Sequence, residues 1–471
     1  MREMQTPRSY WLQEALAADT DIAPSLEGRV KAEVCIVGGG FTGLWTAIRL
    51  KEAEPALDIV LVERDVCGGG ASGRNGGFVL SLWAKFLKLE HLCGTAEALR
   101  LAEASAEAVA EIGEFCQAHQ IDAGYRRDGW LWAATSRMQV GAWTETVERI
   151  EQQGKSPFVA WTPEEVAHRS GSPVHLAGVF EPTAAQVQPA KLARGLRRVA
   201  VERGVRLFEN TPLVRLVRST PPVVHTPRGQ VEAKKVVLAM NAWGIREPEI
   251  RQAVLVMASD MVITEPVTEF LEQSGWSDGL LISDARRLVH YYRTTVSGRI
   301  AFGKGGIPTF AFAGRVGPAF DGRSRMAGQV EAWLKWTYPP LRNVPCPVNW
   351  TGPIDRSKDG LPIFGRLSGR PDLLFGVGYS GNGVGPSVLG GRILASLVLE
   401  KKDEWSGCGL VRPLRRTFPP EPFRYLGSHI VRKAVALKDQ AEDAGRKPNA
   451  LVERIAALAP AGLSPTKSPK P

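Results

Sequence analysis

The sequence predicts a chain of mixed class, α/β together with α+β, in which a parallel-sheet domain is interleaved with an antiparallel-sheet domain and followed by a helical extension. Three observations predict it. Residues 32–65, AEVCIVGGGFTGLWTAIRLKEAEPALDIVLVERD, follow the order strand, glycine turn, helix and strand, which is one βαβ unit. Residues from about 246 to 345 contain short alternating strands, notably RRLVHYYRTT and GRIAFGKGG. Residues 372–400 return to a parallel-type strand and helix.

The chain is predicted to leave the parallel-sheet domain and to return to it twice. TAEALRLAEASAEAVAEIGEFCQAHQI has the 3.6-residue periodicity of a helix, and KKVVLAMNAWG is typical of a buried strand. We therefore divide the sequence into a parallel-sheet domain of three parts (28–95, 176–245 and 346–405), an antiparallel-sheet domain of two parts (96–175 and 246–345) and a tail (406–471).

The composition is that of an ordinary globular protein. The 471 residues, 44% hydrophobic and 23% charged, are enough for two domains with a full core. The chain begins without the apolar stretch of a signal peptide, and no segment approaches about 18 consecutive apolar residues, so we expect a cytoplasmic protein. The six cysteines form no C-x-x-C pair and the seven histidines form no metal-spaced pair, so no metal site is predicted.

The positive charge is concentrated in the tail. Of the net charge of +10, residues 401–471 carry +7, because they contain 14 Lys+Arg against 7 Asp+Glu. The rest of the chain has no basic stripe, so we expect no nucleic-acid partner.

Apolar residues of the tail are spaced as in a helix. Phe423, Leu426, Ile430 and Leu437 follow this spacing, and the terminal LSPTKSPKP is expected to be disordered. A helix packed on the protein's own body or on a sister subunit is the favoured interpretation, and a helix lying on a membrane surface is the alternative.

A dinucleotide-binding motif follows the first predicted strand. Gly38, Gly40 and Gly43 form G-x-G-x-x-G between a strand and a helix, with Phe41 and Thr42 inside the motif, where a pyrophosphate can meet bare backbone N–H groups. Twenty residues further on, Glu63 ends the next strand. A carboxylate there accepts hydrogen bonds from the adenosine ribose and repels a 2′-phosphate, which predicts FAD or NAD rather than NADP.

Six glycines among the eleven residues of CGGGASGRNGG, 67–77, predict backbone pressed against a large flat group. ERDVCGGGASGRNGG resembles the D-amino-acid oxidase superfamily of flavoproteins, and GASGRNGG looks most like its gamma-glutamylputrescine oxidase and glycine/sarcosine oxidase branch, over residues from about 30 to 400. The resemblance implies a Rossmann-like FAD-binding domain of the glutathione-reductase type with an interleaved substrate domain. It implies FAD contacts at Arg64, Gly70, Ala71, Ser72, Arg74, Asn75, Gly76 and Gly77.

Three later segments extend the resemblance. VVLAMNAWG is similar to the family's VVLATGAW and places Asn241 and Trp243 near the dinucleotide. NTPLVRL places Leu213 at the adenine. FGVGYSGNGVGPS is similar to the closing GFSGHG loop, whose following helix stabilises negative charge on the reduced flavin. The matching residues are Gly381, Asn382, Gly383 and Val384, and Asn382 replaces the family's usual histidine.

The sequence departs from the family at the substrate clamp. In glycine and D-amino-acid oxidases an arginine of a G-x-R-P segment binds the substrate carboxylate, and in TGPIDRSKDGLPIFG its place is taken by Ile354. An amine that lacks an α-carboxylate fits this pattern better, and Arg356, two positions on, is the alternative clamp. The family's flavin-attaching cysteine is matched by Gly352, while Cys346 lies six residues too early, so we expect non-covalent FAD.

Four residues are candidates for catalysis, namely His290, Tyr292, Arg293 and Lys304. On the predicted strand HYYR, His290 and Tyr292 share one face, and Tyr291 and Arg293 share the other; ordinary sheet packing is the alternative role. Lys304, in a strand that resembles the one ending beside the flavin, could stabilise superoxide. GRIAFGKG is not a phosphate loop, because Gly305 stands where Ser or Thr must hold Mg²⁺.

The resemblance implies an FAD-dependent amine oxidase that passes hydride from a small-molecule amine to the flavin and electrons to O₂, giving H₂O₂. The alternatives are a glycine, sarcosine or D-amino-acid oxidase and an amine dehydrogenase that reduces a membrane quinone. A flavoprotein that binds tRNA through the tail is a remote alternative, and an oligomer is compatible with the sequence.

Overall fold

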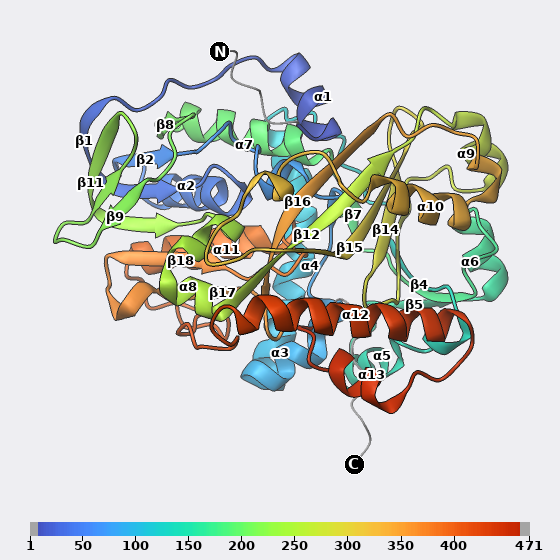
Figure 1. The fold of residues 1–471 in the computed structure, drawn as a ribbon. Helices are drawn as coiled ribbons and strands as arrows, with labels where there is room; N and C mark the ends of the chain where they lie inside the picture. The colour runs from blue at the N-terminus through green and yellow to red at the C-terminus, as the bar shows by residue number, and fades with distance from the viewer. Residues whose placement is uncertain (1–7, 462–471) are drawn as a thin grey trace.

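The computed structural model describes residues 8–461, the side chains of residues 306–308 excepted, and within this range the strands form two large sheets and a small ribbon (Figure 1). The predicted terminal LSPTKSPKP lies outside the described residues. The path of the first sheet is β17-β18-β11-β1-β2-β8, with β10 added to β11 and β9 to β10. Its strands are β1 (Gly28–Val37), β2 (Ile59–Val62), β8 (Arg206–Phe208), β9 (Arg215–Val217), β10 (Val223–His225), β11 (Gly229–Leu238), β17 (Ile363–Arg366) and β18 (Leu373–Val377).

The middle of the first sheet is parallel. β1 runs parallel to β11 and β2, β2 to β8, and β11 to β18, so the sequence-distant segments 28–62, 206–238 and 373–377 build one layer. β2 reads IVLV and is buried at every position, as expected for a strand covered on both faces. This arrangement is the Rossmann-like α/β layer that the sequence predicts.

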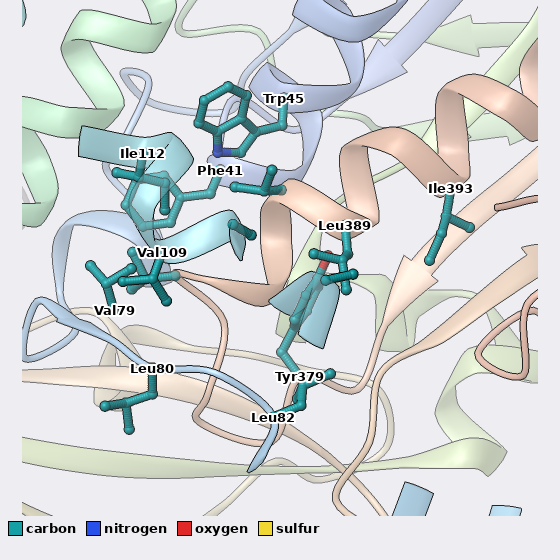
Figure 2. Close-up of a cluster of buried hydrophobic side chains, with 14 of the residues drawn as sticks. Phe41, Trp45, Val79, Leu80, Leu82, Val109, Ile112, Tyr379, Leu389 and Ile393 are labelled. Carbon is teal, nitrogen blue, oxygen red and sulfur yellow. The ribbon is translucent and has the colours of Figure 1, made fainter. Parts of the chain in front are cut away.

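Helices cover this sheet through a shared apolar core. α2 (Phe41–Ala53), α4 (Thr95–Ala118), α7 (Pro189–Glu202) and α11 (Pro386–Val398) pack against one another around it. Figure 2 shows the interior of this packing, where Phe41 and Trp45 of α2 face Ile112 of α4, with Leu389 of α11 beside them. The side chain of Trp45 is fully buried, so the helix that opens at the glycine turn is held firmly in place.

The second sheet is mainly antiparallel and has the order β16-β12-β15-β14-β13-β4-β6-β5. Its strands are β4 (Trp130–Ala134), β5 (Val159–Trp161), β6 (Ala177–Glu181), β12 (Val254–Ile263), β13 (Leu281–Asp284), β14 (His290–Thr294), β15 (Ile300–Phe310) and β16 (Val348–Ser357). β6 and β16 belong to this sheet, although the division made from the sequence groups their residues with the parallel-sheet domain. The sheets thus do not follow the residue ranges of the predicted domains at these two strands, and the domain boundaries themselves stay a prediction.

The remaining elements complete the two layers. β3 (Phe78–Val79) pairs with β7 (Ala185–Gln186) as a ribbon. The other helices are α1 (Tyr10–Ala18), α3 (Phe86–Cys93), α5 (Thr144–Glu151), α6 (Pro163–Arg169), α8 (Pro248–Ala253), α9 (Thr268–Ser274), α10 (Ala327–Thr337), α12 (Phe423–Asp443) and α13 (Ala450–Ala456). In Figure 1, α12 crosses the front of the molecule with α13 below it. No helix within residues 8–461 has the length and hydropathy to cross a bilayer.

Candidate active site

A cavity lies where the loops of the first sheet meet strands of the second. One side is lined by residues at or after the ends of β1, β2, β11 and β18, and the other by residues of β12, β14, β15 and β16. The carboxyl ends of parallel strands share one edge of a sheet, so these loops converge there, and open α/β sheets bind their ligands at this edge.

The first glycine turn joins β1 to α2 on the floor of the cavity. Gly38 has φ +117°, and a Cβ at this position would lie 2.4 Å from the carbonyl oxygen of Ala239, so only glycine fits. The backbone N–H of Phe41, in the first turn of α2, donates to Oγ of Ser72 at 2.9 Å. The N-cap residue of α2 is Gly40, which has no side chain, so backbone N–H groups of the turn can approach a phosphate group.

Glu63 stands directly after β2 and is held by backbone groups. Its Oε2 accepts a hydrogen bond from the N–H of Gly39 at 2.7 Å, and its Oε1 accepts one from the N–H of Asp65 at 3.0 Å. Burial raises the pKa of Glu63, and the two N–H donors oppose this shift. The carboxyl group is therefore fixed at the rim of the glycine turn, where the motif requires the ribose to lie.

The second glycine loop is braced by its own polar side chains. Nε of Arg74 donates to the carbonyl oxygen of Gly69 at 3.0 Å, and burial lowers the pKa of Arg74 to about 10. The side chain of Asn75 donates to the carbonyl oxygens of Ala71 and Ser72 and accepts from the N–H of Gly77 at 2.7 Å. Arg74 and Asn75 thus fix the shape of the cavity wall.

A third segment closes the nucleotide side. η4, the 3-10 helix Asn241–Arg246, follows β11, and the guanidinium carbon of Arg64 lies 4.3 Å from the centre of the Trp243 ring. Nη1 of Arg246 donates to the carbonyl oxygen of Leu213 at 2.9 Å. Arg64, Leu213, Trp243 and Arg246 all line the cavity, so segments far apart in sequence meet around one end of it.

The loop before α11 forms the opposite wall. Nδ2 of Asn382 donates to the carbonyl oxygen of Ser81 at 2.9 Å. Asp355 accepts a hydrogen bond from the N–H of Gly378 at 2.6 Å and one from Nδ2 of Asn241 at 3.2 Å. Burial raises the pKa of Asp355 to about 7. The loop is therefore fixed to both sheets just before the N-terminus of α11.

Most of the predicted cofactor residues line this cavity. The structure places these there: Gly38, Gly40, Phe41, Thr42, Glu63, Arg64, Gly70, Ala71, Ser72, Arg74, Asn75, Gly76, Leu213, Asn241, Trp243, Gly381, Asn382, Gly383 and Val384. Gly43 and Gly77 lie outside the lining. A Cβ at Gly43 would be 1.9 Å from the carbonyl oxygen of Gly38, and one at Gly77 would be 2.2 Å from that of Val187, so both glycines serve close backbone packing.

The second sheet contributes another wall of the cavity. Tyr291 lines the cavity, its hydroxyl lies 2.9 Å from Oγ of Ser259, and its ring packs edge-on against Phe78. Burial raises the pKa of Tyr291 to about 12, which keeps its hydroxyl protonated at neutral pH. Ile354 and Arg356 of β16 also line this part of the cavity.

The structure places Lys304 and His290 on the other face of the second sheet, outside the cavity lining. Nζ of Lys304 lies 2.8 Å from Nε2 of His290, whose Nδ1 lies 2.8 Å from a carboxylate oxygen of Asp284. Side chains alternate along a strand, so Gly303 and Gly305 take the cavity side of β15 and Lys304 points away from it. Lys304 and His290 therefore do not enter the proposed chemistry.

Tyr292 and Arg293 also lie outside the lining. Tyr292 is buried in an apolar cluster, stacked on Phe302 and hydrogen-bonded to His175. Nη1 of Arg293 donates to Oε1 of Gln186 at 2.5 Å, and its guanidinium lies over the ring of Trp11. Of the strand HYYR, Tyr291 alone lines the cavity, because His290 and Tyr292 point to the other face of the sheet and Arg293 packs beside Gly77, outside the lining.

Several lining residues were not found from the sequence. Tyr379 receives a hydrogen bond from Oγ1 of Thr42 at 2.8 Å and packs beside Leu389 (Figure 2). Asp355, Ser259 and Arg246 are the others of clear chemical interest. Two of the four had a signal in the sequence: Asp355 adjoins the departure at Ile354, and Tyr379 lies within the segment FGVGYSGNGVGPS.

The lining fits a large polar ligand with a flat part. Nε1 of Trp243 and Oδ1 of Asn382 are buried and have no hydrogen-bond partner within the described part of the chain, and both belong to lining residues. The glycine turn, the carboxyl group of Glu63 and the glycine-rich loop supply what a pyrophosphate, a ribose and a ring system require. The fold and the cavity thus define the class of proteins that hold a dinucleotide cofactor between a Rossmann-like layer and a second sheet.

Comparison with known proteins agrees with this class. The sequence model of the DAO family, described as FAD dependent oxidoreductase, matches residues 33–397, and the chain belongs to this family. The chain is 31% identical over 377 residues to gamma-glutamylputrescine oxidoreductase of Escherichia coli strain K12, covering 79% of this chain and 85% of that protein. It is 25% identical over 385 residues to glycine oxidase of Geobacillus kaustophilus, covering 79% of this chain and 93% of that protein.

Solved structures share the fold. The crystal structure of glycine oxidase from Geobacillus kaustophilus superposes with a TM-score of 0.65 at 20% identity and covers 83% of this chain and 100% of that chain. The crystal structure of L-proline dehydrogenase from P. horikoshii superposes with a TM-score of 0.64 at 20% identity and covers 80% of this chain and 94% of that chain. The protein is an FAD-dependent oxidoreductase of the DAO family, as the glycine motifs predict.

Proposed function

We propose that this enzyme oxidises a C–N bond of a primary or secondary amine that carries no carboxylate on the reacting carbon. The observation that carries the proposal is Ile354, which lines the cavity and packs with an apolar cluster that contains Leu255, Met257 and Phe310. An isoleucine in this setting offers no donor to a carboxylate. The 31% identity to a gamma-glutamylputrescine oxidoreductase, named for an amine derivative, supports this substrate class.

The residues of the chain would bind and orient the substrate. Non-covalently bound FAD would supply the two-electron chemistry that oxidises the amine to an imine, with O₂ as the proposed electron acceptor and H₂O₂ as the second product. Phe78, Leu80 and Ile354 line the cavity and would exclude water from the reacting carbon. Tyr291 stays protonated and is held by Ser259, so its hydroxyl can accept a hydrogen bond from an amine N–H.

The N-terminus of α11 would stabilise charge on the reduced cofactor. Gly383 and Val384 line the cavity immediately before this helix, which begins at Pro386. The partial positive charge of a helix N-terminus favours an anion in front of it. This part of the chain therefore supplies the electrostatic stabilisation that the family's closing loop is expected to give.

A second candidate is an amino-acid oxidase that uses Arg356 as its clamp. Arg356 lines the cavity; its Nη1 donates to the carbonyl oxygen of Ala461 at 3.2 Å, and its Nε has no hydrogen-bond partner among the described residues. A guanidinium so placed could bind the carboxylate of glycine, sarcosine or a D-amino acid. The 25% identity to a glycine oxidase supports this second candidate.

Anaerobic bleaching of the flavin absorbance separates the two candidates. The purified holoenzyme is mixed without oxygen with glycine, sarcosine, D-alanine, gamma-glutamylputrescine and simple monoamines, and air is then readmitted. We expect bleaching only by amines without an α-carboxylate, with rapid return of colour in air. If glycine, sarcosine or D-alanine bleaches the flavin and Arg356→Met abolishes that bleaching, the amino-acid oxidase replaces the proposal. A slow return of colour in air would favour a quinone as the electron acceptor.

A further inference from the structure

The two faces of α12 have different environments. Val435 is buried with Leu288 and Ala456, and Asp439 accepts a hydrogen bond from the N–H of Leu288 at 3.3 Å. These contacts fix one face of the helix on the body, and α13 packs against it as well. The helix therefore cannot rotate to bury its opposite face.

The opposite face carries an exposed apolar stripe, which we define as Phe423, Leu426, Ile430 and Leu437. Their exposed fractions are 67%, 55%, 59% and 45%. At 3.6 residues per turn the four side chains fall within about 60° of the helix circumference. The helix expected from the sequence does pack on the protein's own body, through residues such as Val435 and Asp439, while these four side chains stay exposed.

Exposed cations lie before, within and after α12 in the chain. Arg415 and Arg416 are exposed before α12, Lys433 is exposed within it, and Arg446 and Lys447 are exposed after it. No ion pair joins any of these five to a carboxylate within residues 8–461. Most nearby carboxylates are already engaged, Glu421 with Arg424, Glu442 with Lys438 and Asp443 with Arg286, while Glu453 of α13 is exposed.

Charge decides which partner fits. A second copy of the chain would bring the same cations toward these ones, and its stripe would offer only four apolar side chains in return. An anionic bilayer surface offers acyl chains to the stripe and negative headgroups to the cations, the combination that interfacial amphipathic helices use. The last ten residues of the sequence add two lysines and no acidic residue to the same end of the chain.

We propose that the stripe of α12 docks the protein on an anionic membrane surface. Phe423, Leu426, Ile430 and Leu437 would enter the boundary between headgroups and acyl chains, and the exposed arginines and lysines would lie over the headgroups. The inference concerns a surface outside the cofactor cavity and does not depend on the identity of the amine substrate or of the electron acceptor.

Cosedimentation with lipid vesicles tests the proposal. The full-length holoenzyme is mixed with vesicles of phosphatidylcholine alone and of phosphatidylcholine with phosphatidylglycerol, at low and high salt. We expect pelleting with the anionic vesicles only, weakening as salt rises. The double variant Leu426→Gln/Ile430→Gln should bind at least about tenfold more weakly, because two large apolar groups no longer enter the bilayer. Arg446→Gln/Lys447→Gln should also weaken binding.

Controls separate docking from folding and from self-association. Val296 is 84% exposed on another part of the chain, so Val296→Gln should bind vesicles like the unchanged protein. All variants should retain FAD and bleach with the same amines. Absence of pelleting, equal binding to neutral and anionic vesicles, or unchanged binding of Leu426→Gln/Ile430→Gln would overturn the proposal. A dimer in solution that Ile430→Gln dissociates would assign the stripe to a second copy instead.

Discussion

At the scale of single residues, Gly43 shows how tightly the cofactor turn is built. The residue lies in the first turn of α2, where the helix passes the end of β1, and a Cβ there would lie 1.9 Å from the carbonyl oxygen of Gly38. Neither the strand end nor the helix can retreat, since Ile36 on one side and Trp45 on the other are fully buried. The close approach of Gly43 to Gly38 therefore makes the shape of the glycine turn between β1 and α2 depend on how the core is packed.

Gly43→Ala should therefore cost both stability and cofactor. We expect a loss of about 2–4 kcal/mol in the free energy of unfolding and weaker FAD binding, because the turn must open to admit the methyl group. Urea denaturation and the flavin content of the purified variant measure the two effects. Gly328→Ala is the matched control, since Gly328 lies in the first turn of α10 with no atom within 4 Å of an added Cβ. Equal stability of the two variants would contradict the argument.

At the scale of elements, a buried charge network fixes α12 to the second sheet. Arg286 pairs with Asp284 at 2.5 Å and with Asp443 of α12 at 2.7 Å, and its guanidinium lies against Trp333. Burial lowers the pKa of the neighbouring Lys304 to about 8. Nζ of Lys304 lies 2.8 Å from Nε2 of His290, which in turn contacts Asp284, so Lys304 adjoins this network on the face of the sheet away from the cavity.

Asp439→Asn should stabilise the protein in a pH-dependent way. Burial raises the pKa of Asp439 from 3.8 to about 6; Asp284 adds to the rise, while the Leu288 N–H, Lys304 and Arg286 oppose it. At pH values between these two pKa values, Asp439 keeps its proton in the folded chain and loses it in the unfolded chain. The free energy of unfolding therefore falls as the pH rises from about 4 to about 6. The variant should gain about 1–3 kcal/mol at about pH 8 and little at about pH 4.

Urea denaturation at the two pH values measures this difference. The exposed Glu453→Gln should change the free energy of unfolding by less than about 0.5 kcal/mol at either pH. An equal gain for Asp439→Asn at both pH values would show that a cause other than ionisation acts.

At the scale of the whole molecule, the cavity joins the two sheets. Gly38, Glu63 and Asn241 reach it from the first sheet, and Ser259 and Tyr291 reach it from the second. A cofactor bound there contacts both layers at once. Its binding energy therefore adds to the stability of the whole fold and not of one layer alone.

Removal of FAD should lower Tm, and added FAD should restore it. Binding to the folded state alone contributes about 2.7 kcal/mol when free FAD is 100 times its Kd. Calorimetry of the apoprotein against FAD concentration measures the shift. Adenosine diphosphate ribose, which lacks the flavin ring, should restore only part of it, and a Tm independent of FAD would contradict a cofactor held between the sheets.

The cofactor site was largely predictable from the sequence because its chemistry is carried by backbone. Gly38, Gly40 and the glycines of 67–77 mark places where the chain must turn or approach a ligand, and such places depend on local conformation. The parallel layer was predictable for a related reason, since an uninterrupted apolar strand such as IVLV needs cover on both faces. The residues that line the substrate side were not predictable in this way.

The sequence by itself determined the βαβ unit, the glycine loops that line the cavity and the period of each strand and helix. Only the tertiary structure decided which side of each element faces the cavity. Strand periodicity separates Tyr291 from His290 and Tyr292, and helix periodicity groups Phe423, Leu426, Ile430 and Leu437, but neither says which group is buried. That choice depends on what packs against each face, and the partners include segments distant in the chain, such as Leu288 for Val435 of α12 and Phe78 for Tyr291.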